Sequence, residues 1–267
     1  MWCSGWRLAA AVSNAGGLGL LGAGSMHPET LREHIRKCRE ATHHAFGVNI
    51  PLMYHQIEEI MQIVADEGVK IVFTSAGSPK KWTGWLHERG ITVVHVVSSS
   101  RFAVKAEEAG VDAIVAEGFE AGGHNGREET TTLCLIPAVR AVTTLPLIAA
   151  GGIATGEAML AARVLGAEGV QIGTRFALTA ESSANEVFKD YCLHLEEGDT
   201  RLLLKKLAPV RLVRNNFRSA VEAAEAVGAS EEELRVLLGR CRAKRGIFEG
   251  DLEEGELEIG QVSALLH

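Results

Sequence analysis

Ala116-Glu-Gly-Phe-Glu-Ala-Gly-Gly-His-Asn-Gly126 is a loop that carries three glycines and one histidine among residues 122–126. It follows Asp112-Ala-Ile-Val115, a short run that predicts a buried strand. Glycines on both sides of His124 let the backbone turn sharply and approach a flat ligand closely, with the imidazole as the one sizeable side chain there. The alternative is an ordinary glycine-rich loop whose histidine is merely solvated.

Short apolar runs of this kind alternate with helical patterns along most of the chain. Predicted strands lie at 18–21, 46–50, 69–74, 91–97, 112–115, 145–152 and 169–174, and predicted helices at 4–14, 28–42, 57–64, 82–86, 101–109, 133–142 and 157–165. Continuous apolar strands joined by crossover helices indicate a parallel sheet that is buried on both faces. Because none of these strands looks like a polar edge, we predict an α/β fold of the TIM-type (β/α)8 barrel.

One strand of such a barrel is not accounted for. An eight-stranded barrel needs a strand before the helix at 4–14, and Met1-Trp-Cys3 is all that precedes this helix. Either the first strand is missing from this chain, or another segment closes the barrel; of the two, we expect the missing strand.

The alternation stops after residue 174. Residues 182–239 are charged and helical in pattern, with Leu202-Leu-Leu204 on one apolar face and no strand-like run. Residues 246–260 are acidic and interrupted by glycines. We predict a barrel domain over 1–181, an appended C-terminal helical lid or substrate subdomain over 182–250, and a truncated segment over 251–267 that returns to the barrel.

The composition excludes several classes of function. The 267 residues carry a net charge of −7 with 46% hydrophobic residues, which suits an enzyme and disfavours a nucleic-acid surface. The five cysteines are scattered without C-x-x-C spacing, so we expect neither a metal site nor a disulfide framework. With no signal-peptide pattern and no long apolar span, we expect a cytoplasmic protein that binds a small molecule and no membrane.

Two glycine segments lie at the ends of the last two predicted strands, Ala150-Gly-Gly152 and Gly173-Thr174. In α/β barrels the active site lies at the carboxyl ends of the strands, and glycines after strands seven and eight commonly bind a phosphate through backbone N–H groups. These glycines could instead serve only the tight turns between strand and helix. Two of them in these positions favour a phosphate site, and a glycine-lined mouth favours a flat phosphorylated cofactor, FMN.

Few polar side chains are available for chemistry at these strand ends. His124 is the candidate acid or base, and Glu117 and Asn49 are candidate hydrogen-bond partners. Thr74 is a further polar residue at the end of a predicted strand.

Five motifs in order along nearly the whole chain resemble a known family. They are Leu8-Ala-Ala-Ala-Val-Ser-Asn-Ala-Gly-Gly-Leu-Gly19, Phe46-Gly-Val-Asn49, Glu117-Gly-Phe-Glu-Ala-Gly-Gly-His124, Ile148-Ala-Ala-Gly-Gly152 and Gln171-Ile-Gly-Thr-Arg-Phe176. With these motifs the chain resembles the FMN-dependent nitronate monooxygenases, also called 2-nitropropane dioxygenases. It is about equally similar to the FMN-dependent enoyl-acyl-carrier-protein reductases of the same superfamily.

The resemblance implies a TIM barrel that holds FMN without a covalent bond. It places the phosphate on Gly151, Gly152, Gly173 and Thr174, and further cofactor contacts on Met1, Asn49, Thr74, Glu117, Gly122, Gly123, Ala150 and Gln171. Both families begin with a strand that ends in Gln-Gly-Gly-Met, of which only Met1 is present here.

The resemblance also implies a role for His124 as the catalytic residue. In the monooxygenases the matching histidine is the base that takes the α-proton of a nitroalkane, whereas a nitronate needs no base. In the reductases it helps to place the cofactor and the substrate, and NAD(P)H reduces the flavin.

The sequence therefore leaves three functions open. The first is nitronate monooxygenase activity, in which an FMN-dependent oxidoreductase oxidises alkyl nitronates with O2; the length and pattern of residues 199–216 favour it. The second is an NAD(P)H-dependent enoyl reductase, favoured by Thr130-Thr-Thr-Leu133 and by Val96-Val97, which stands where many monooxygenases carry a lysine. The third is a flavin-binding protein without turnover. A homodimer is the assembly that we consider.

Overall fold

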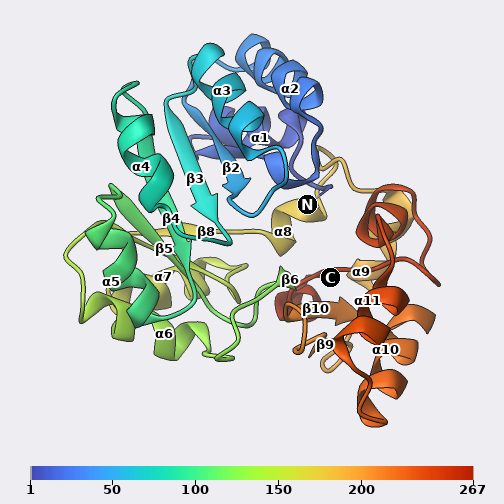
Figure 1. Cartoon of the computed structure of the whole chain (residues 1–267). Helices are drawn as coiled ribbons and strands as arrows, with labels where there is room; N and C mark the ends of the chain where they lie inside the picture. The colour runs from blue at the N-terminus through green and yellow to red at the C-terminus, as the bar shows by residue number, and fades with distance from the viewer. Residues whose placement is uncertain (1, 267) are drawn as a thin grey trace.

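The computed structural model describes residues 2–266, and its central element is a sheet of seven parallel strands (Figure 1). These strands are β1 (Gly19–Gly22), β2 (Phe46–Pro51), β3 (Ile71–Ser75), β4 (Thr92–Val97), β5 (Ala113–Glu117), β7 (Leu147–Ala150) and β8 (Gly169–Gln171). They lie in the order β1-β2-β3-β4-β5-β7-β8, so strands that follow one another in this part of the chain are also neighbours in space. The seven strands predicted between residues 18 and 174, and their parallel pairing, are confirmed.

Helices link successive strands, because parallel neighbours need a crossover connection. The linking helices are α2 (Pro28–Ala41), α3 (Ile57–Asp66), α4 (Lys80–His87), α5 (Ser100–Glu108), α6 (Thr132–Arg140) and α7 (Gly156–Val164). In addition, α1 (Trp6–Asn14) precedes β1, and the short α8 (Thr174–Ala177) follows β8. Local sequence explains where several begin: Pro28 opens α2, and the side chains of Ser99 and Thr155 cap α5 and α7. Within residues 2–266, no helix is both long enough and apolar enough to span a membrane.

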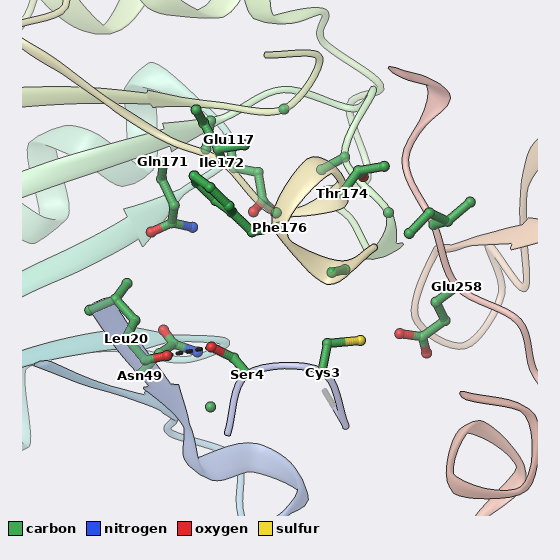
Figure 2. Close-up of a pocket in the computed structure, with 18 of the residues that line it drawn as sticks. Cys3, Ser4, Leu20, Asn49, Glu117, Gln171, Ile172, Thr174, Phe176 and Glu258 are labelled. Atoms are coloured by element: carbon green, nitrogen blue, oxygen red, sulfur yellow. Dashed lines mark hydrogen bonds between the residues drawn. The ribbon is translucent and has the colours of Figure 1, made fainter. Parts of the chain in front are cut away.

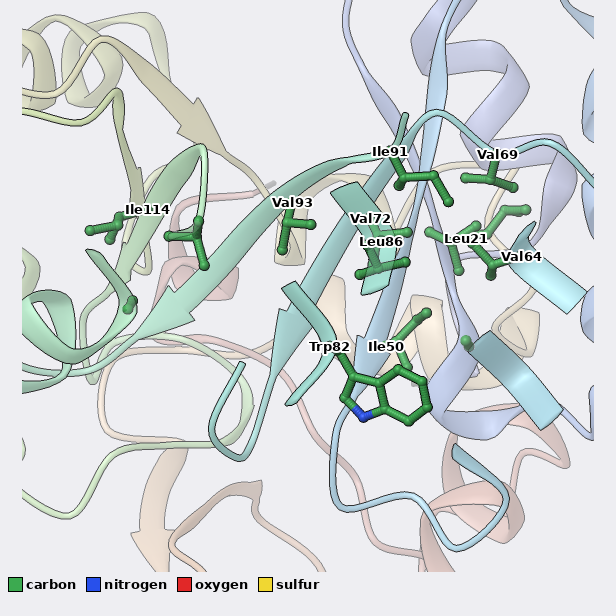
Figure 3. Packing of buried hydrophobic residues seen from close by; sticks show 14 of the residues in the cluster. Leu21, Ile50, Val64, Val69, Val72, Trp82, Leu86, Ile91, Val93 and Ile114 are labelled. Atoms are coloured by element: carbon green, nitrogen blue, oxygen red, sulfur yellow. The ribbon is translucent and has the colours of Figure 1, made fainter. Parts of the chain in front are cut away.

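The two faces of the sheet are buried in different surroundings. One face packs against the helices, where residues such as Leu21, Val72 and Ile114 join the main core cluster (Figure 3). The other face contributes to a cluster built from strand residues alone, among them Phe73 and Val94. Since side chains alternate between faces along a strand, this second cluster is the interior of a curved, barrel-like sheet.

The sheet has two edges, β1 and β8. Residues 3 and 4 form backbone hydrogen bonds with segments near both edges. The Gly22 amide, at the end of β1, donates to the Ser4 carbonyl at 3.0 Å, and the Ser183 amide, after α8, donates to the Cys3 carbonyl at 2.9 Å. The N-terminal segment thus joins the end of β1 to the chain that follows α8. The architecture is an α/β barrel of the TIM type with seven parallel strands.

The position of Gly19, the first residue of β1, shows why the first motif ends in a glycine. A Cβ atom there would lie 1.8 Å from the Ala9 carbonyl oxygen, because the backbone of α1 crosses β1 at this point. Ser13 supports the same contact, since its hydroxyl accepts a hydrogen bond from the Gly19 amide at 3.1 Å. Any side chain at Gly19 would separate α1 from the sheet.

The C-terminal part is largely helical, as predicted, with α9 (Glu186–Leu193), α10 (Asn216–Ala226) and α11 (Glu231–Leu238). It also contains strands that we did not predict: β9 (Thr200–Leu203) and β10 (Val210–Val213) form an antiparallel sheet with β6 (Gly123–His124). The expectation of no strand in this region was wrong. Each of the two strands has four residues, too few for periodicity to separate a strand from a helix face.

Candidate active site

A cavity of about 310 Å³ lies at the carboxyl ends of β1, β2, β5, β7 and β8 (Figure 2). Glu117 and Gln171 approach it from one side, and Asn49 and Ser4 approach it from the opposite side. Most of the residues predicted to contact a cofactor line this cavity: Asn49, Glu117, Gly122, Ala150, Gly151, Gly152, Gln171, Gly173 and Thr174. Parallel strands bring these residues together because their carboxyl ends meet at one end of the sheet.

Both positions of the glycine pair after β7 require a residue without a side chain. Gly151 and Gly152 have φ values of +87° and +70°, in the left-handed region that favours glycine. A Cβ atom on Gly151 would also lie 2.5 Å from the Gly118 carbonyl oxygen. The turn therefore presents bare backbone to the cavity.

The backbone N–H groups around this turn are free to bind a ligand. Among residues 2–266 we find no hydrogen-bond acceptor for the amides of Gly152, Gly173 and Thr174. A Cβ atom on Gly173 would meet nothing within 4 Å, so open space lies in front of this residue. Amides without an acceptor, on two glycine turns that line one cavity, are suitable for holding an anion, and we call them the cradle.

Thr174 adds a hydroxyl to this cradle. Its Oγ1 accepts a hydrogen bond from the Gly260 amide at 3.0 Å, which leaves the hydroxyl proton free for a ligand oxygen. Among the described residues that line the cavity, none is a lysine, an arginine or a histidine. An anion would therefore be held by backbone dipoles and this hydroxyl.

Two carboxylates line the cavity, Glu117 at the end of β5 and Glu258 on the C-terminal segment. Burial raises the pKa of the Glu117 carboxyl from 4.5 to about 7, because a charge there loses its hydration. Both the protonated and the ionised form of Glu117 are therefore accessible near neutral pH. It can donate or accept a hydrogen bond in the site.

The raised pKa of Glu117 predicts a specific dependence of stability on pH. Between pH 4.5 and 7 the folded state keeps a proton that the unfolded state has released, so stability falls as the pH rises through this window. Glu117→Gln cannot ionise. As the pH rises from 4.5 to 8, we expect the free energy of unfolding of the variant to increase relative to that of the original protein by up to about 3 kcal/mol. Urea unfolding of both flavin-free proteins at pH 5 and pH 8 measures this, and an equal difference at both pH values would contradict it.

Thr74 lies outside the cavity lining. Thr74 lies on β3 and is fully buried, and its hydroxyl is 2.7 Å from Nδ1 of His95 on the neighbouring strand β4. Phe73, its neighbour in the chain, faces the barrel interior, so alternation along β3 turns Thr74 away from that interior. Burial also lowers the pKa of His95 to about 4, which keeps its imidazole neutral.

His124 and Gly123 form the short strand β6, next to the cavity but outside its lining. His124 pairs with Val210 on β10, and its side chain is exposed. It follows Gly122, which does line the cavity, by two residues. Met1, the remaining predicted contact, lies outside the described residues.

Several lining residues were not predicted because they come from both ends of the chain. Cys3 and Ser4 approach from the N-terminal segment, and Glu258 approaches from the C-terminal segment (Figure 2). Ile259 and Val262 of the C-terminal segment also line the cavity. None of them belongs to a recognisable motif, and Glu258 stands in an acidic stretch that is typical of solvated chain. No signal in the sequence places them at the site.

The C-terminal segment, residues 251–266, is tied closely to the histidine loop, which comprises residues 118–126. The Gln261 amide donates to the Glu120 carbonyl at 3.0 Å. A Cβ atom on Gly122 would lie 2.5 Å from the Gly260 nitrogen, so the two backbones touch. This contact explains why residue 122 is a glycine although its φ is not positive.

Comparison with known proteins shows what the chain is similar to. The family model described as nitronate monooxygenase matches residues 1–61 and 53–267. A probable nitronate monooxygenase from Staphylococcus aureus (strain JH9) is 33% identical over 238 residues, which cover 73% of this chain and 67% of that protein.

Two solved structures share the fold over 99% of this chain. FabK from Thermotoga maritima has a TM-score of 0.91 and 41% identity, with 84% of its own chain covered. A nitroalkane oxidase from Streptomyces ansochromogenes has a TM-score of 0.83 and 27% identity, with 88% of its chain covered. Together with the family model, which spans the chain, these likenesses show that the protein belongs to the nitronate monooxygenase family.

Proposed function

We propose that this protein is an FMN-dependent oxidoreductase that oxidises alkyl nitronates with O2, and neutral nitroalkanes with the help of His124. The observation that supports the proposal most is the cradle of free amides at Gly152, Gly173 and Thr174, which lines a cavity at the strand ends in a member of this family. A fold alone would not support an activity, since one scaffold serves many reactions.

The cavity fits the cofactor in size and in chemistry. Its volume of about 310 Å³ falls within the range of about 300–1,000 Å³ that is usual for ligand sites. The amide cradle and the Thr174 hydroxyl would hold the phosphate, while Asn49, Glu117 and Gln171 offer hydrogen bonds to the polar edges of a flat ring. When bound, FMN supplies an electron acceptor that dioxygen can reoxidise.

The chain's own residues would bind the substrate and move one proton. For a neutral nitroalkane, the His124 imidazole accepts the α-proton, and this step converts the substrate into its nitronate. A nitronate that is supplied preformed has already lost this proton, so the chain's residues need only bind it beside the cofactor. The lining glycines leave room for the substrate to approach the ring plane.

A second candidate is NAD(P)H-dependent reduction of an enoyl thioester. It is supported by Val96, an apolar residue packed against the strand-only cluster of the barrel interior, where many monooxygenases carry a lysine. A third, flavin binding without turnover, has the same cofactor site and no electron donor.

Anaerobic mixing of the FMN-loaded protein with NADH, NADPH and an alkyl nitronate, in separate cuvettes, distinguishes the three. We expect the nitronate to bleach the flavin absorbance within the time of mixing by hand, and both nicotinamides to bleach it far more slowly. Rapid bleaching by a nicotinamide would establish the reductase instead. Flavin that stays oxidised in every cuvette would leave only the binding function.

A further inference from the structure

Arg211 is a buried charge that the proposed chemistry does not use. It lies on β10, and 1% of its surface is exposed. The hydrogen bonds that its guanidinium makes to described residues all go to neutral oxygens, not to a carboxylate. Burying a charge removes its hydration, and this cost is offset only where hydrogen bonds replace the lost water contacts.

The contacts of Arg211 converge on the loop that begins at the end of β5. Nε lies 3.2 Å from the carbonyl oxygens of both Phe119 and Ala121, and one Nη lies 2.6 Å from the Phe119 oxygen. The guanidinium also stacks on the Phe119 ring, 4.8 Å from its centroid. The backbone of Arg211 pairs with Gly123 across the small sheet, so side chain and backbone hold the same loop.

Holding the Ala121 carbonyl also orients the next amide. In a trans peptide the C=O and N–H bonds point in opposite directions, so the Gly122 N–H points away from Arg211. Ala121 and Gly122 line the cavity, whereas Arg211 does not. Within residues 2–266 we find no acceptor for the Gly122 N–H, which therefore remains available to a ligand.

Other donors limit how far this loop can rotate. The Glu120 carbonyl accepts from the Gln261 amide at 3.0 Å. Asn125 Nδ2 donates to the carbonyls of Ala121 and Gly123 at 3.0 and 2.9 Å. Arg211 is the donor to the Phe119 carbonyl and the charged donor to the Ala121 carbonyl, and charged donors form the stronger hydrogen bonds.

We propose that Arg211 is a positioning residue: by holding the carbonyls of Phe119 and Ala121, it directs the Gly122 N–H into the cavity as a preformed donor to an acceptor atom of the cofactor. The inference rests on the proposed function for the identity of that ligand. It assigns the small C-terminal sheet a part in cofactor binding, through a side chain that never reaches the cofactor.

The test compares Arg211→Met and Arg211→Lys with Arg218→Met. Arg218 is a matched control, because it is also buried in the C-terminal subdomain but donates to Asp199 and Glu222 instead of the loop. We expect Arg211→Met to weaken FMN binding about tenfold, the loss of one well-placed hydrogen bond, and Arg211→Lys to restore part of it. Arg218→Met should lower the melting temperature while leaving the Kd for FMN within about twofold.

A second readout does not depend on FMN. Hydrogen exchange of the peptide spanning residues 118–124, in the full-length protein without flavin, should become faster in Arg211→Met and stay unchanged in Arg218→Met. Unchanged exchange and an unchanged Kd in Arg211→Met would overturn the inference, as would equal weakening of FMN binding by both methionine variants. If the original protein binds no FMN at all, the proposed function fails, and the exchange experiment still decides whether Arg211 orders the loop.

Discussion

His124→Ala is expected to lower turnover of neutral nitroalkanes by about 10²- to 10⁴-fold, the usual contribution of a positioned general base. Turnover of preformed nitronates should stay within a few-fold of the original protein, because a nitronate has already lost the proton that the histidine would remove. Oxygen consumption measured with a nitroalkane and with its nitronate, at one pH and in separate assays, gives both values.

His43→Ala is the matched control for this experiment, since His43 is also exposed and lies on the loop before β2, among residues that do not line the cavity. It should leave both rates unchanged. If His124→Ala lowered both rates equally, the base assignment would be wrong and the histidine would instead contribute to binding or to loop structure.

Gly152→Val is expected to release FMN from the protein. A valine at φ +70° is strained, and its Cβ would lie 3.3 Å from Glu120 Cβ. We expect the turn to relieve this strain by changing its φ, which takes its amide out of the cradle. Strain of this size, together with one lost hydrogen bond, should weaken FMN binding by about 100-fold or more. The ratio of flavin to protein after gel filtration measures the loss.

Gly90→Val separates loss of the cradle from general backbone strain. Gly90 has a φ of +66°, and a Cβ atom there would meet nothing within 4 Å, so this variant has the same strained conformation at the turn after α4. It should lose stability but keep its flavin. Full flavin content in Gly152→Val would refute the proposed role of this turn.

The barrel was predictable because its signals are local. Each strand is a short run of apolar residues, and the helices that follow have an apolar face and, in several cases, a first-turn signal such as Pro28. A parallel sheet then follows from the crossovers, without knowledge of any distant contact. Strands β9 and β10 were missed because four residues carry too little periodicity, and because one of the two partners of β10, the two-residue β6, lies far away in the chain.

The cavity lining was predictable where residues stand at the ends of the parallel strands, whether glycines or polar residues such as Asn49, Glu117 and Gln171. Gly151, Gly152 and Gly173 follow strands directly, so their place at the cavity follows from the topology alone. Thr74 shows the limit of this reasoning: near the end of a strand, the register decides whether a residue or its neighbour faces the interior.

By itself the sequence determined the parallel sheet, the end of the sheet that carries the site and the glycine turns that could hold a phosphate, since each depends on residues close together in the chain. Only the tertiary structure decided that Cys3, Ser4 and Glu258 complete the cavity and that Arg211 holds the histidine loop. The hydrogen bonds of Arg211 to Phe119 and Ala121 join residues 92 and 90 positions apart, and the bond of Ser182 to the Cys3 carbonyl joins residues 179 positions apart. No local pattern encodes such a pairing, because it depends on how the C-terminal sheet packs against the end of the barrel.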